Sequence, residues 1–234
     1  MISTRIFVAL VLLCVSTGSA LAQNSVAWLS YRDQYRSMLW FEKYGKPKHL
    51  IQNHWQVVAK NGAGAPNSVG PVKLSLVGKS IRLELPLDET GRTVFPLLKA
   101  AYDENAELQL NQQLDWVTVR ALVSIVIRAD GLYEVADLRA ACAQVLDFQN
   151  WRDARVLQGK KCVGVRFVFG KNATPPQLRK ADQTLSALPL MEGVAFWGDT
   201  QGRFQTASVW FASTSEQGQV LTRSPPLALA AWFE

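Results

Sequence analysis

The sequence predicts an α+β fold in which β-rich antiparallel modules flank a central strand-helix-strand unit and an amphipathic helix precedes them. Three observations support this prediction. Short segments with period-two alternation of apolar and polar residues lie on both sides of the middle of the chain, as at 80–85. A longer central segment, 135–148, has helical spacing instead. Another helical pattern covers 28–44, near the N-terminus.

The first 22 residues have the features of a secretory signal peptide. Arg5 provides the positive charge, an apolar stretch covers 6–15, and Ala20-Leu21-Ala22 matches the small-x-small cleavage pattern. The apolar stretch is far shorter than the roughly twenty residues that cross a bilayer as a helix, and no later stretch qualifies. We therefore expect a periplasmic or secreted protein, cleaved near Ala22, whose mature chain has no transmembrane segment.

Four regions follow from these patterns. They are the signal peptide at 1–22, an N-terminal helix with a β module at 23–112, the strand-helix-strand unit at 113–175 and a C-terminal β-hairpin module at 176–234. Cleavage would leave 212 residues, which is enough for one large domain or two small ones with a sizeable core.

The N-terminal region begins with the helix at 28–44, which ends at Gly45 and Pro47. Apolar side chains surround most of this helix: Trp28, Tyr31, Tyr35, Met38 and Leu39 on one face, and Trp40, Phe41 and Tyr44 on the other. A Gly- and Pro-rich loop at 61–71 and a turn at 88–91 separate the strands that follow. These strands are expected at 49–60, 72–77, 80–85, 93–95 and 106–111.

The central unit is expected to consist of a strand at 117–128, a turn at 129–131, the helix at 135–148 and a strand at 162–169. After Pro175-Pro176 we expect a short helix at 177–185. A hairpin with strands at 193–197 and 203–211 follows, then a strand at 220–222. The apolar C-terminal segment, 227–233, should be packed inside, because an exposed one would promote aggregation.

Two cysteines, Cys142 and Cys162, lie beyond the signal peptide. An even number of cysteines in an exported protein favours a disulfide bond, which here would join the central helix to the strand that follows it. The chain-entropy model gives such a bond about 3 kcal/mol of stabilisation. The sequence has no C-x-x-C motif, and two histidines are too few to complete a zinc site.

Positive charge is concentrated near the mature N-terminus. Loss of Arg5 with the signal peptide leaves 24 basic and 19 acidic residues, a net charge of +5, and residues 23–60 carry +4 of it. Such asymmetry can indicate an anionic partner such as lipid or polysaccharide, although a mildly basic surface can also serve solubility alone. Nucleic acid is not expected, because the chain has no dense basic stripe. The candidate contacts are Arg32, Arg36, Lys43, Lys46 and Lys48.

A turn motif occurs twice, as Asp88-x-x-Gly91-Arg92 and Asp199-x-x-Gly202-Arg203, each between apolar strands. A duplicated hairpin module would explain this, and so would the general preference of hairpin turns for Asp and Gly. The first copy lies in Leu85-Pro86-Leu87-Asp88-x-x-Gly91-Arg92, followed by Phe95-Pro96-Leu97, Ala106-x-Leu108-x-x-Asn111 and, near the end, Ser224-Pro225-Pro226-Leu227. Over residues 70–234 the chain thereby resembles uncharacterised exported proteins of Gram-negative bacteria. The resemblance implies no activity.

Familiar catalytic motifs do not occur in the sequence. It contains no G-x-S-x-G, S-x-x-K or H-E-x-x-H motif and no glycine pattern for phosphates or dinucleotides. The two histidines, His49 and His54, should point to opposite faces of one strand and so form a poor metal pair. A serine triad built on either histidine stays geometrically open. We assign no catalytic, cofactor-binding or metal-binding residue and expect no cofactor.

The chain has eight tryptophans, and aromatic rings stack well on sugar rings. We expect most of them in the core, with Trp40, Phe41, Trp55 and Trp197 as the exposed aromatic side chains. These observations favour a periplasmic, non-enzymatic binding or envelope-assembly component whose partner is an envelope protein, an anionic lipid or a polysaccharide. Two alternatives stay open: an exported hydrolase of unrecognised type and a glycan-binding β module.

Overall fold

The structure is a computed structural model that describes residues 26–59, 71–112, 117–199 and 203–234. It is a β-rich α+β fold made mostly of antiparallel sheets, which confirms the predicted class. The predicted signal peptide, most of the predicted loop at 61–71 and part of the second Asp-x-x-Gly-Arg motif lie outside the described residues. Within the described ranges, the structure contains no helix with the length and apolar character needed to span a membrane.

The N-terminal half contains β1 (Val26–Ser30), α1 (Tyr31–Lys43), β2 (Ile51–Ala59), β3 (Leu74–Val77), β4 (Arg82–Leu85), β5 (Arg92–Thr93), α2 (Lys99–Asp103) and β6 (Glu107–Leu110). The rest contains β7 (Val117–Ile125), β8 (Leu132–Glu134), α3 (Val135–Arg152), β9 (Cys162–Phe169), β10 (Gln177–Arg179), β11 (Leu185–Ala187), β12 (Met191–Gly193), β13 (Phe204–Trp210), β14 (Gln219–Leu221) and β15 (Ala228–Phe233).

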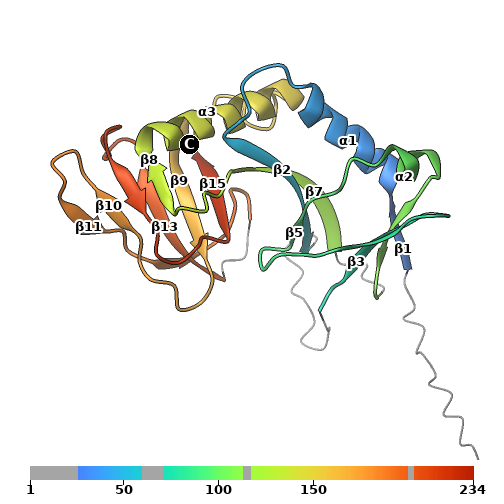
Figure 1. Ribbon diagram of the computed structural model, residues 1–234. Helices are drawn as coiled ribbons and strands as arrows, with labels where there is room; N and C mark the ends of the chain where they lie inside the picture. Colours follow the sequence, from blue (N-terminus) through green and yellow to red (C-terminus); the bar gives the residue numbers. More distant parts are fainter. Residues whose placement is uncertain (1–25, 60–70, 113–116, 200–202) are drawn as a thin grey trace, which may run out of the picture.

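The described residues form three sheets. The N-terminal sheet has the strand order β1-β6-β3-β4, the C-terminal sheet has the order β11-β10-β14-β8, and the large sheet has the order β12-β13-β9-β15-β7-β2-β5. The apolar C-terminal segment forms β15, an internal strand of the large sheet, so its predicted burial is confirmed. Figure 1 shows α3 over one part of the molecule, α1 over the other, and β2 and β7 running between them.

The long strands β2 and β7 connect two hydrophobic cores. They pair over nine positions, from Ile51 with Ile125 to Ala59 with Val117. On one face, Ile51 and Ile125 belong to the C-terminal core, whereas Trp55 and Val117 belong to the N-terminal core. Because alternate residues of a strand share a face, the opposite face carries the remaining, mostly polar side chains of these two strands.

The N-terminal core lies between the N-terminal sheet, α1 and the adjoining end of the large sheet. Tyr31 of α1 is fully buried there, and its hydroxyl donates to the carbonyl oxygen of Pro96 and accepts from the backbone N–H of Leu98 (2.9 Å). Burial raises the pKa of this hydroxyl. These contacts join the start of α1 to the segment before α2.

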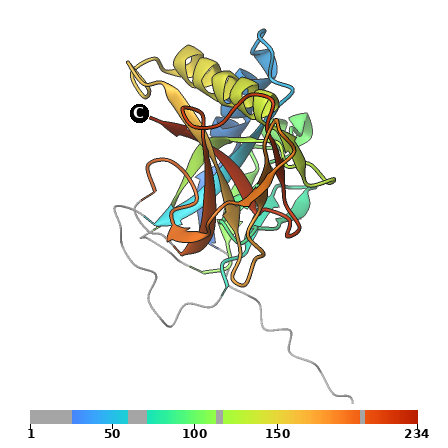
Figure 2. The same cartoon turned by 90° about the vertical axis from the view of Figure 1, so that its left-hand side faces the viewer.

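The C-terminal core lies between α3 and the large sheet. The helix buries Val135, Leu138, Cys142 and Val145 against β9 and its neighbours, as its spacing predicted, and Phe148 is buried as well. In Figure 2, α3 lies above the orange and red strands of this part. The helix α3 continues to Arg152, four residues beyond its predicted end.

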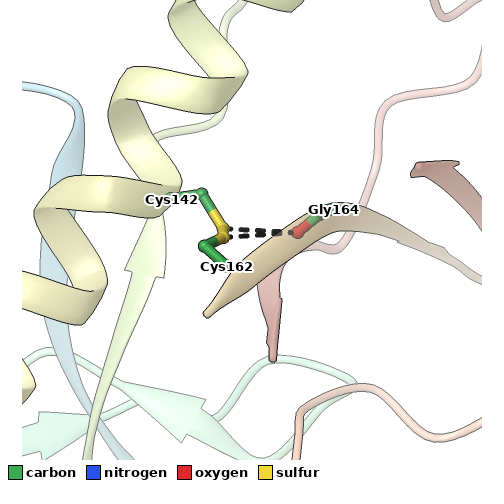
Figure 3. The surroundings of a disulfide bond; sticks show 3 residues. All are labelled: Cys142, Cys162 and Gly164. Atoms are coloured by element: carbon green, nitrogen blue, oxygen red, sulfur yellow. Dashed lines mark hydrogen bonds between the residues drawn. A yellow bond between two sulfur atoms is a disulfide. The ribbon is translucent and has the colours of Figure 1, made fainter. Parts of the chain in front are cut away.

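The predicted disulfide bond between Cys142 and Cys162 is present, with the two Cα atoms 6.0 Å apart. Figure 3 shows it joining α3 to the start of β9, with both sulfur atoms close to the carbonyl oxygen of Gly164 (3.3 and 3.8 Å). Because this covalent bond lies in the middle of α3, it fixes the position of the helix on the sheet.

The helix predicted at 28–44 is observed as α1, Tyr31–Lys43, but its first three residues and the whole helix predicted at 177–185 are wrong. Trp28 lies in β1, and α1 begins at Tyr31, because the residues before it pair with β6, as Ser30 does with Glu107. The short helix at 177–185 does not form either: β10 pairs with both β11 and β14. The turn between β10 and β11 has Gln183 at φ 68° and a hydrogen bond from the Thr184 N–H to Asp182 (2.9 Å), which is hairpin geometry.

Candidate functional site

Two tryptophans from different helices meet on the surface where α1 and α3 approach each other. Trp40 of α1 and Trp151 of α3 are 50% and 43% exposed, and their ring centroids are 5.4 Å apart in an edge-to-face arrangement. Large aromatic side chains are usually withdrawn from water, so two of them in contact on the surface indicate an interaction site.

Two buried aromatic rings, Tyr44 and Phe148, contact Trp151, which in turn contacts Trp40. Tyr44 and Phe41 each contact Phe148 at 5.2 Å, and Tyr44 also contacts Trp151 at 5.2 Å. The Tyr44 hydroxyl is buried and has no hydrogen-bond partner among the described residues, and burial together with nearby Asp147 raises its pKa. Ring contacts therefore join α3 to α1 and the residue that follows it, and Trp40 and Trp151 are the exposed members of this group of rings.

Basic side chains flank the indoles on α1. Arg36 and Lys43 lie four residues before and three residues after Trp40, so all three belong to one exposed stripe of the helix. Arg36 forms an ion pair with Asp33 (3.2 Å), and both side chains are more than 60% exposed, so the pair contributes little energy. Lys46 is exposed on the segment that follows the helix. We call Arg36, Trp40, Lys43, Lys46 and Trp151 the helix-junction surface.

The other two predicted basic contacts have structural roles. Arg32 donates from Nε to the carbonyl oxygen of Tyr102 (2.7 Å), and its guanidinium lies over that ring at 5.1 Å. Lys48 donates from Nζ to the carbonyl oxygens of Phe41 (2.6 Å) and Glu42 (2.8 Å), near the C-terminal end of α1. There it satisfies carbonyl groups that the helix leaves without partners.

The four aromatic residues predicted to be exposed have different outcomes. Trp40 is exposed, whereas Phe41 and Trp197 are only partly exposed. The prediction for Trp55 is wrong, since it is 1% exposed. Its indole stacks on Phe95 at 4.8 Å and donates from Nε1 to Gln34 (2.8 Å), so both its apolar and its polar parts have partners in the N-terminal core.

A buried polar cluster lies on the opposite face of the large sheet. His54 is 9% exposed and Ser124 is fully buried; the Ser124 hydroxyl is 3.3 Å from Nδ1 of His54. Arg92, also buried, donates to that hydroxyl (3.1 Å) and forms an ion pair with Asp88 (2.8 Å). Burial, and secondarily the charge of Arg92, lowers the pKa of His54 to about 4.

This cluster has a serine beside a histidine, but its geometry favours a structural role. The hydroxyl of Ser124 is buried and already accepts from Arg92, and the carboxylate of Asp88 pairs with Arg92. Asp88 also accepts from the backbone N–H groups of Thr90 (2.8 Å) and Arg92 (2.9 Å). The cluster thus fixes the Asp-x-x-Gly-Arg turn on the sheet.

The second turn with this motif makes a different contact. Asp199 forms an ion pair with Arg120 of β7 and accepts from the Phe196 backbone N–H (3.1 Å). The Phe196 ring also lies under the guanidinium of Arg92, at 5.3 Å. Arg92 of the first motif and Asp199 of the second therefore both contact side chains on the polar face of the large sheet.

A pocket of about 290 Å³ lies at the edge of the N-terminal sheet, lined by Trp28, Leu29, Ser30, Asn105, Ala106 and Glu107. Predicted site residues are not among its lining. Over the described ranges, His, Cys, Asp and Glu side chains form no group of three that could hold a metal ion. Comparison with known proteins finds no matching family model, curated protein or solved structure.

The helical pattern at 28–44 includes Arg36, Trp40 and Lys43 of the helix-junction surface, but no predicted helix includes Trp151. The predicted central helix stopped at Phe148, so Trp151 was left outside it. The sequence does contain a signal for a longer helix. Trp151 lies three residues after Phe148, which is the spacing expected for one further helical turn.

Proposed function

We propose that the protein is an exported, non-enzymatic binding component of the bacterial envelope that docks on an anionic membrane surface through the helix-junction surface. The observation that carries this proposal is the contact between the exposed indoles of Trp40 and Trp151, with Arg36 and Lys43 on the same stripe as Trp40. Export is supported by the signal-peptide features of residues 1–22.

The chemistry of this surface suits a lipid headgroup region. Indole rings have an apolar body and a polar N–H, and they prefer the boundary between water and hydrocarbon. A basic side chain near an anionic membrane contributes about 1 kcal/mol. Arg36, Lys43 and Lys46 would together supply about 3 kcal/mol, in addition to the partial burial of two indoles.

The hydrolase alternative has less support. His54 and Ser124 are the one histidine-serine pair that a hydrogen-bond distance joins within the described residues, and the serine is buried. A nucleophile must reach its substrate, so this pair would need a rearrangement of the Arg92 contacts before it could react.

The proposal is tested with vesicles of anionic and of zwitterionic lipid. The unmodified protein should sediment with anionic vesicles and not with zwitterionic ones. Binding should weaken as salt rises from about 0.05 M to about 0.5 M, because the screening length falls from about 14 Å to about 4 Å.

Charge reversal identifies the surface. Changing Arg36, Lys43 and Lys46 to Glu should abolish sedimentation with little change in the melting temperature, because all three side chains are exposed. The matched control reverses three exposed bases elsewhere, Lys73, Arg82 and Lys171, and should retain more than half of the binding. Equal losses in the two variants would mean that overall charge, and not this surface, drives binding.

A further inference from the structure

A second pair of tryptophans lies on the face of the large sheet that points away from α3. Trp232 of β15 and Trp210 of β13 are both paired in register with Gly164 of β9, which lies between them. Residues paired in register have side chains on the same face, so the two indoles flank the glycine. Trp210 is 40% exposed and Trp232 is partly exposed.

Gly164 keeps the space between the two indoles free of a side chain. A Cβ atom at this position would lie 3.1 Å from Cε3 of Trp210 and 2.5 Å from the carbonyl oxygen of Val209. The ring of Trp210 therefore lies close to the backbone of β9. Since neighbouring strands are about 4.8 Å apart, the backbones that carry the two tryptophans are about 10 Å apart.

Arg166 lies two residues further along β9 and therefore on the same face. Its guanidinium carbon is 3.4 Å from the centroid of the Trp232 ring, which is direct stacking contact. Nη1 donates to the carbonyl oxygen of Val194 (3.2 Å).

The positive charge of Arg166 is not balanced by a carboxylate in the described part of the chain. The ion pairs there involve other bases, and Nε of Arg166 is buried without a hydrogen-bond partner. Partial burial lowers the pKa of the guanidinium, so the charged form is held at a cost. An anion bound at the exposed part of the guanidinium would reduce this cost and accept from its N–H groups.

We infer that Arg166, Trp232 and Trp210 form a binding site for a carboxylated saccharide. The guanidinium, held flat by stacking on Trp232, would receive a carboxylate through its N–H groups, and the exposed indole of Trp210 would stack on a sugar ring. An isolated anion would use only the first of these contacts, and a neutral sugar only the second.

This site is separate from the helix-junction surface, which is formed by α1, the segment after it and the last turn of α3. Residues Trp40 and Trp151 belong to the helix side of the large sheet, whereas Trp210 and Trp232 lie on its other face. The inference therefore goes beyond the proposed docking function and can fail or succeed independently of it.

The test uses a pentamer of galacturonic acid, its carboxyl-reduced galactose counterpart and inorganic phosphate, each titrated into the unmodified protein in a calorimeter. The galacturonate pentamer should bind saturably. The neutral pentamer should bind at least about tenfold more weakly, because it lacks the charge-assisted hydrogen bonds. Absence of galacturonate binding, equal affinity for the neutral pentamer, or full competition by phosphate at equal concentration would each overturn the inference.

Substitutions then locate the site. Arg166→Gln should weaken galacturonate binding about tenfold or more, and Trp210→Ala about fivefold. Trp210 is exposed, so its variant should fold; Arg166→Lys, which retains the charge and the aliphatic stem, replaces Arg166→Gln if the latter unfolds. Two controls, Trp151→Ala and the Glu triple variant of the helix-junction surface, should bind like the parent. If these controls lost binding and the Arg166 variants retained it, the ligand would bind at the helix-junction surface and the inference would be wrong.

Discussion

The buried imidazole of His54 should make the free energy of unfolding depend on pH. Its pKa in the folded protein is about 4, against 6.5 for an exposed histidine. Between these two values the unfolded chain binds a proton that the folded protein does not, so stability falls as pH falls from about 7 to about 4. A shift of about 2.5 pH units at 1.36 kcal/mol per unit corresponds to a loss of about 3 kcal/mol.

The assay is urea unfolding, followed by tryptophan fluorescence at several pH values between 7.5 and 4. His54→Gln cannot bind the proton, so its free energy of unfolding should depend less on pH than that of the parent. The difference between the two free energies should change by about 3 kcal/mol across this range. His49→Gln is the control, because His49 is exposed, and it should retain the slope of the parent. Parallel curves for the parent and His54→Gln would refute the buried, neutral imidazole.

Two further predictions concern the framework. Replacement of both Cys142 and Cys162 by Ala should cost about 3 kcal/mol and lower the melting temperature by about 6 to 12 °C, as measured by calorimetry; an unchanged melting temperature would show that the bond adds nothing. Gly91→Ala should destabilise by more than 2 kcal/mol, because Gly91 has φ 77° and a Cβ atom there would lie 2.8 Å from the Val57 carbonyl oxygen. Gly159→Ala should cost only about 1 kcal/mol, because Gly159 has φ 72° but a Cβ atom there would meet nothing within 4 Å. Equal costs for the two variants would contradict a steric clash with the Val57 carbonyl oxygen.

Local patterns predicted those elements whose own residues decide their structure. The spacing of Val135, Leu138 and Cys142 predicted α3, because one face of that helix is buried along its whole length. The two cysteines predicted the disulfide bond from their number and the expected compartment alone. Alternation also predicted β9 at its observed bounds, whereas the strand predicted at 193–197 is observed as β12 at Met191–Gly193.

Elements decided by distant partners were predicted poorly. The segment before α1 becomes β1 because β6, about eighty positions away, offers a strand edge. The segment at 177–185 has helical spacing, yet pairing of β10 with β14 outweighs it. Trp55 was expected on the surface for a similar reason: its burial depends on Phe95 and Gln34, and neither is adjacent in sequence.

The candidate sites also depend on contacts between elements that are distant in sequence. Arg36, Trp40 and Lys43 could be placed on one exposed stripe from helical periodicity, but Trp151 joins them only through the packing of α3. The stacking of Arg166 on Trp232 depends on the order of strands in the large sheet, which alternation within a single strand does not specify.

The most direct test of the proposed function is the binding of a double variant, Trp40→Ser with Trp151→Ser, to anionic vesicles at about 0.1 M salt. Both side chains are half exposed, so the variant should fold, and it should lose most of the binding of the parent. Trp210→Ser, which removes a tryptophan of similar exposure from another face, should bind like the parent. Undiminished binding of the double variant, or no binding by the parent protein, would contradict docking through the helix-junction surface.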